Sequence, residues 1–189
     1  MAESEQESVP LRVASFMAFA TLGVLSTTQE LAGTVLGSVD GADPELIAEE
    51  TLCLVATATA RAAEVGLRET PAVAAAVVPA LAALPFIYRD YLVGGALMAT
   101  QEQALLDESE AIYLRLRRKL DFYTVHLPPG PFPGERALTD KMGLWMGRIS
   151  PPRLPEMPTE RLARLPLIPA LLTHLRLVLA YGRRPSDVF

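Results

Sequence analysis

The amino-acid sequence predicts an all-α protein: a bundle of four or five helices with a proline-rich irregular arm and a C-terminal helix. Three observations support this fold class. Two helix start signals of one type bracket a glycine stop, a long stretch after Pro85 has helical periodicity, and eight of the sixteen prolines lie in residues 128–158. At 189 residues, half of them apolar, the chain is long enough to bury the core of one domain.

The first helix is expected at residues 11–36, where apolar residues occur on most sides. Residues 1–10 form an acidic N-terminus that we expect to be frayed. Three glutamates occupy the place where a signal peptide carries positive charge, which predicts an intracellular, cytoplasmic chain without a signal peptide. The spacing of Gly33 and Gly37 would permit close approach of another helix.

A helical hairpin is expected next. Asp43 and Pro44 form the first start signal, since aspartate caps free N–H groups and proline at the first helical position loses no hydrogen bond. Periodic apolar residues follow as far as Gly66, and glycine is common just beyond a helix end. Thr70 and Pro71 then repeat the start signal, so two helices are joined by a short turn.

The stretch from Thr70 to Tyr88 contains no charged residue over nineteen positions. Its seven Val, Leu, Ile and Phe residues would favour membrane insertion by about 2–4 kcal/mol. Proline inside a helix costs about 3 kcal/mol, and this stretch contains Pro79 and Pro85. We therefore predict a thin, alanine-rich helix at the centre of a soluble bundle, kinked or broken near one of these prolines.

One helical stripe of apolar residues then continues from Tyr88 to Tyr123. Residues 111–127 and 171–181 also alternate apolar and basic residues, so the sequence leaves helix and strand open at both places.

We divide the chain into an acidic N-terminus (1–10), a helical bundle domain (11–127), a proline-rich arm (128–158) and a C-terminal helix packed on the bundle (159–189). The C-terminal helix contains Pro166 and Pro169, where we expect interruptions, and Gly182, where we expect its end.

The sequence contains no short motif for a catalytic, metal or phosphate site. A carboxylate-bound metal bundle needs glutamate three positions before histidine, but Tyr123 and Leu171 hold those positions before His126 and His174. The single cysteine, Cys53, lies in an apolar stretch and is expected to be buried. Neither a glycine-rich phosphate loop nor a nucleophile elbow is present. We therefore expect no cofactor, no metal and no enzyme activity.

Charge is distributed unevenly along the chain. Residues 1–110 carry a net charge of −12 and residues 111–189 a net charge of +7. The densest basic run comprises Arg115, Arg117, Arg118 and Lys119. Such a run either pairs with the acidic half of the same chain and with its own helix dipole, or docks on a protein partner or a second copy. Nucleic acid is not favoured, because the chain is acidic overall and has no aromatic platform beside the arginines.

The arm offers a second interaction surface. Pro152, Pro155 and Pro158 recur every three residues, so in a polyproline II helix they share one edge. Trp145 is expected to anchor the arm over its own core or over a neighbouring subunit.

The expected function is a non-catalytic assembly or adaptor protein that self-associates or joins a larger complex through protein–protein contacts. Its expected partner-binding residues are Arg115, Arg117, Arg118, Lys119, Trp145, Pro152, Pro155 and Pro158. An alternative is a membrane-associated helical protein that uses residues 13–36 and 71–98 at a bilayer. A third is a small helical enzyme, for which a substrate-shaped pocket containing Glu49 or Glu50, His126 or His174 would be the structural sign.

Overall fold

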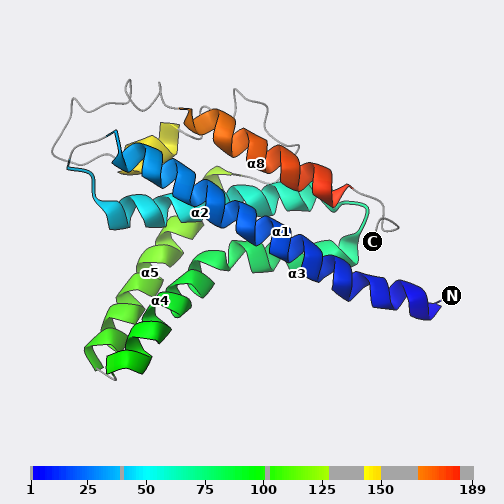
Figure 1. The fold of residues 1–189 in the computed structure, drawn as a ribbon, viewed down its shortest axis with the longest axis horizontal. Helices are drawn as coiled ribbons and strands as arrows, with labels where there is room; N and C mark the ends of the chain where they lie inside the picture. Colours follow the sequence, from blue (N-terminus) through cyan, green and yellow to red (C-terminus); the bar gives the residue numbers. More distant parts are fainter. Residues whose placement is uncertain (1, 39–40, 101–102, 128–142, 150–165, 184–189) are drawn as a thin grey trace.

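The computed structural model describes residues 2–38, 41–100, 103–127, 143–149 and 166–183. The helices are α1 (Ala2–Leu36), α2 (Pro44–Gly66), α3 (Pro71–Ala82), α4 (Leu84–Thr100), α5 (Gln103–His126) and α8 (Leu167–Gly182), and residues 143–149 form a further short helix (Figure 1). The described residues contain no strand, which confirms the all-α fold class. The strand alternative is wrong for residues 111–126 and 171–181, which are helical because their buried residues recur every three or four positions.

The local start and stop signals act largely as expected. Asp43 caps α2, and its Oδ1 accepts hydrogen bonds from the backbone N–H groups of Glu45 at 3.0 Å and Leu46 at 3.1 Å. Thr70 precedes α3 but makes no capping bond, since its hydroxyl donates to the carbonyl of Leu67. The chain breaks between α3 and α4 at Ala83, close to the expected position, and α8 ends at the expected glycine.

Three expected features of the helices are corrected. Helix α1 begins at Ala2, nine residues before the expected start at Leu11. Pro169 does not interrupt α8, because it lies in the first turn, where an N–H group has no partner within the helix. The single stripe expected after Pro85 is divided between α4 and α5, which lie side by side and project from the rest of the bundle (Figure 1).

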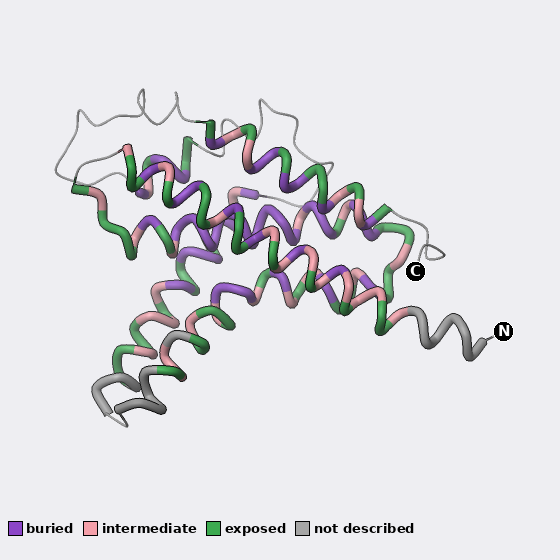
Figure 2. Tube along the Cα trace, in the orientation of Figure 1, coloured by how far each residue is buried: buried purple, intermediate pink, exposed green. Residues whose placement is uncertain are grey.

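The central helix of the bundle is α2, and the prediction of a central helix at residues 71–88 is wrong. Every residue from Glu50 to Ala60 is buried (Figure 2), whereas α3 buries only Val73, Val77 and Leu81. Helices α1, α3, α4, α5 and α8 all contact α2. The small Ala, Thr and Cys side chains around α2 allow neighbours to approach from every side.

The threonines of α2 are buried without needing outside partners. Thr51 and Thr57 donate hydrogen bonds to the backbone carbonyls four residues earlier, those of Ile47 and Cys53, at 2.6 and 2.8 Å. A polar side chain that bonds to its own helix avoids the free-energy cost of burying an unpaired hydroxyl.

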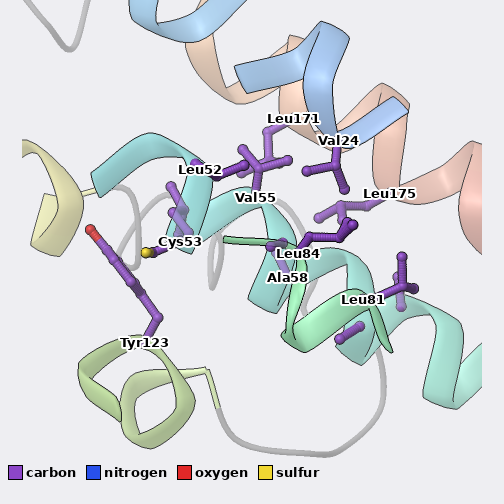
Figure 3. Close-up of a cluster of buried hydrophobic side chains, with 14 of the residues drawn as sticks. Val24, Leu52, Cys53, Val55, Ala58, Leu81, Leu84, Tyr123, Leu171 and Leu175 are labelled. Carbon is purple, nitrogen blue, oxygen red and sulfur yellow. The ribbon is translucent and has the colours of Figure 1, made fainter. Parts of the chain in front are cut away.

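The core lies where α1 and α8 cover α2. Val24 of α1, Val55 of α2 and Leu175 of α8 point toward one another (Figure 3). At the end of this interface the backbones of α2 and α8 touch, because a Cβ atom on Gly182 would lie 2.9 Å from the carbonyl carbon of Gly66. The two glycines therefore permit a helix contact that any side chain would prevent.

Candidate functional site

Two of the four residues in the basic run of α5, Arg115 and Lys119, pair with carboxylates of α2. Nζ of Lys119 lies 2.5 Å from Oε2 of Glu49 on α2 and 3.8 Å from Oε1 of Glu50. One turn earlier, Nη2 of Arg115 lies 2.7 Å from Glu49 and also pairs with Glu45. Opposite charges separated by about seventy residues along the chain thus bind α5 to α2.

Glu50 forms the buried centre of this group, which we call the α2–α5 ion cluster. Its carboxylate, 2% exposed, accepts hydrogen bonds from the hydroxyl of Tyr123 at 2.8 Å and from Nε and Nη2 of Arg148 at 2.7 and 2.6 Å. The Arg148 guanidinium also lies 4.2 Å from the ring centroid of Phe122. The short helix 143–149 therefore contacts both α2 and α5 through Arg148. The Arg148–Glu50 pair is bidentate, which is the strong form of an ion pair.

Burial and neighbouring charges shift the pKa values of Glu49, Tyr123 and Cys53. Burial alone would raise the pKa of Glu49, but hydrogen bonds from Arg115 and Lys119 outweigh it and lower that pKa. Burial, together with the negative charge of Glu50, raises the pKa of Tyr123. Burial also raises the pKa of the nearby Cys53 thiol, which keeps it protonated and therefore a poor nucleophile.

The eight expected partner-binding residues do not form one described surface. Lys119 and Trp145, 5% and 0% exposed, lie in the interior. Arg117 and Arg118 are exposed on α5, and Arg117 donates a hydrogen bond to the hydroxyl of Tyr113. The sequence pattern could not separate these roles, because neighbouring positions on a helix face different directions. Pro152, Pro155 and Pro158 lie outside the described residues.

An uncharged stripe runs along the outer face of α1, opposite its buried side. We call it the α1 stripe, and its members are all exposed: Leu11, Ala14, Ala18, Leu22, Leu25, Gln29, Gly33 and Leu36. Leu22 is 69% exposed. The spacing of three, four and four residues repeats after eleven, which is three turns, so the stripe follows the helix axis closely. This spacing was readable in the sequence, but α1 is apolar on most sides and nothing marked which side faces outward.

Among the described residues, two helical stretches are long and apolar enough to cross a membrane: Val9–Leu36 of α1, and Pro71–Gly95, which comprises α3 and most of α4. Both satisfy this criterion by length and composition alone, and the first contains the α1 stripe. On the second, Ile87, Tyr88 and Tyr91 are exposed large side chains.

A groove of about 440 Å³ lies between α1 and α8, and we call it the α1–α8 groove. Its lining includes Gly23, Thr27 and Glu30 from α1 and Thr173 and His174 from α8. His174 is the member that the sequence had suggested for an enzyme pocket. Burial lowers the pKa of His174 to about 4, so its imidazole is neutral and only a weak base at neutral pH.

The hydrogen bonds of His174 define its tautomer. Its Nε2 lies 2.8 Å from Oγ1 of Thr59, and that hydroxyl already donates its single proton to the carbonyl of Val55 at 2.7 Å. We assign the ring proton to Nε2, because this tautomer satisfies the Val55 carbonyl, the Thr59 hydroxyl and Nε2 together, and it leaves Nδ1 as an unprotonated acceptor. The ring edge with Nδ1 faces Gly23, where a Cβ atom would lie 2.7 Å from Nδ1.

Among the described residues, no group of three or more His, Cys, Asp or Glu side chains is placed to hold a metal ion. No protein-family model, curated protein or solved structure matches this chain. The features of the described residues that bear on function are the α1 stripe, the α2–α5 ion cluster and the α1–α8 groove.

Proposed function

We propose that this protein is a non-catalytic assembly protein that self-associates through the α1 stripe. The observation that carries the proposal is the stripe itself, eight uncharged exposed residues in a straight row. From the first to the last member it extends about 38 Å at the rise of an α-helix. An exposed row that is apolar except for Gln29 is typical of a protein–protein contact rather than of a solvated face.

The intervals between successive stripe residues are the same when read from either end of the helix. Two copies can therefore pair in antiparallel orientation with stripe residues opposite one another. A two-fold axis midway along the stripe would place Leu22 of one copy opposite Leu25 of the second copy. The same axis would place Leu11 opposite Leu36 at both ends. Glu30, the exposed carboxylate beside the stripe, would lie about 20 Å from its symmetry mate, so no close repulsion opposes the pairing.

A charge at the centre of the stripe should abolish self-association. In the double variant L22E/L25E the axis would bring four carboxylates together, and like charges at an interface are strongly unfavourable. We expect size-exclusion chromatography with light scattering to give a dimer for the wild type and a monomer for this variant. V125E is the matched control, because Val125 is an exposed apolar residue on α5, outside the stripe. A wild-type monomer, or equal effects of both variants, would contradict the proposal.

The direction of pairing can be tested by cross-linking. In the antiparallel arrangement, L22C protein mixed with L25C protein should form a disulfide-linked dimer faster than either protein alone. Cys53 is buried and does not compete. Fastest reaction of each variant with itself would indicate parallel pairing.

A membrane-associated protein is the second candidate, favoured by the length and exposed surface of the two helical stretches Val9–Leu36 and Pro71–Gly95. About twenty apolar residues suffice to span a bilayer. Flotation with phosphatidylcholine vesicles separates the two functions, since a bilayer protein should float with lipid and lose this property in L22E/L25E. A soluble wild-type dimer that stays out of the floated fraction would exclude this candidate.

A further inference from the structure

We propose that the α1–α8 groove is a binding site for an alkylammonium group, which donates hydrogen bonds to His174 Nδ1 and to the oxygens of the groove. This site is separate from the proposed self-association. The groove lies about a third of a turn around α1 from the α1 stripe, so pairing through the stripe leaves it accessible.

His174 supplies the acceptor at the floor of the groove. Its side chain is 7% exposed, and its ring proton is committed to Thr59 on the core side. Among the described residues, no donor bonds to Nδ1, which faces Gly23 at the edge of the groove. Nδ1 is open to solvent, since Thr28 Oγ1 and Trp145 Nε1 are the buried polar atoms without a partner among the described residues. A cationic N–H group that reaches Nδ1 would therefore replace a water molecule there and form a charge-assisted hydrogen bond.

The other polar groups of the groove also favour a cationic donor. The hydroxyl of Thr173 donates to the carbonyl of Pro169 at 2.8 Å, so its oxygen is left to accept. Glu30 adds an exposed carboxylate, and the described residues that line the groove include no lysine or arginine. An ammonium group has three donors and no acceptor, which matches a nitrogen, a hydroxyl oxygen and a carboxylate.

The apolar part of the groove fits a short carbon chain. Pro169, Ala170 and Leu177 of α8 line it beside the polar groups. A ligand with a charged head and a few methylene groups would therefore bury its carbons against α8 while its head reaches His174. A free small amine and the lysine side chain of another protein share this chemistry.

The test is NMR of the full chain labelled with ¹⁵N-histidine, titrated with butylammonium chloride at constant ionic strength. We expect a saturable shift of the His174 Nδ1 resonance, because a new donor changes the shielding of the accepting nitrogen. His126, on α5, is the internal control and should not shift. Butanol, which has the same carbon chain without the charge, should bind at least tenfold more weakly.

Two exposed positions allow variants that leave the fold intact. E30Q removes the charge of an exposed carboxylate and should weaken binding about two- to fivefold. T173V removes a hydroxyl oxygen that would accept a hydrogen bond from the ammonium group, and it should weaken butylammonium binding about tenfold. E69Q, an exposed glutamate far from the groove in the turn before α3, should leave the affinity unchanged.

A second titration, with Nα-acetyl-lysine methylamide, tests whether the natural ligand is a free amine or a lysine side chain of another protein. Tighter binding of this compound than of butylammonium assigns the groove to a protein lysine, and the reverse order assigns it to a free amine. An unshifted His174 resonance with both amines, or equal binding of butanol and butylammonium, would overturn the proposal.

Discussion

Replacing Lys119 with methionine tests whether the basic run of α5 holds the fold together or docks on a partner. Methionine retains most of the length and apolar stem of lysine but removes the ammonium group. In K119M, Glu49 would keep Arg115 as a partner, and Glu50 would keep Arg148 and Tyr123. The perturbation is therefore the loss of one buried charge from a cluster that otherwise stays paired.

The magnitude follows from burial and distance. Lys119 and Glu49 have side chains 6% and 14% exposed, with their charged atoms 2.5 Å apart. Breaking a buried ion pair costs about 3–5 kcal/mol, and we expect about 3 kcal/mol here because each carboxylate keeps an arginine. For a chain of 189 residues, this corresponds to a fall in Tm of about 6–12 °C.

Urea unfolding followed by circular dichroism, for wild type, K119M and R118M, measures this loss. Arg118 is the exposed neighbour in the same run, and its replacement should change stability by less than about 0.5 kcal/mol. The pKa of Glu49 is lowered in the folded state, so its contribution is present at neutral pH and is lost as pH falls. The difference in free energy of unfolding between wild type and K119M should therefore begin to shrink as the pH falls below 4.5, the ordinary pKa of a glutamate.

Equal stability of K119M and R118M would refute this reasoning. If K119M also failed to associate while remaining fully stable, the docking role expected from the sequence would stand instead.

Two further predictions concern α8. In G182A the new methyl group would meet the backbone of Gly66 at 2.9 Å, which cannot move aside as a side chain could, so urea unfolding should show a loss of about 1–3 kcal/mol. Burial holds the pKa of His174 at about 4, below its ordinary 6.5, so folding favours the neutral ring. Stability should therefore fall by about 3 kcal/mol from pH 6.5 to 4, and H174Q should lack this part of the slope.

The sequence by itself determined the helical class and several helix ends. Asp43 followed by Pro44 starts α2, Gly182 ends α8, and the chain breaks close to Pro85. These features depend on groups within a few residues of one another: a carboxylate near free N–H groups, a proline without a donor, a glycine without a Cβ. Local chemistry of this kind is readable from the order of the residues.

Only the tertiary structure decided which helix is central and which charges are used. The segment at 71–88 and helix α2 are both rich in small apolar residues, but α2 is the one that α1, α3, α4, α5 and α8 all contact. Lys119 lies beside Arg118 in the chain, yet one is buried against Glu49 and the other is exposed. Sequence periodicity predicts which residues share one face of a helix. The residue that covers that face, such as Glu49 for Lys119, lies some seventy residues away in the chain, and its position depends on how all the helices pack together.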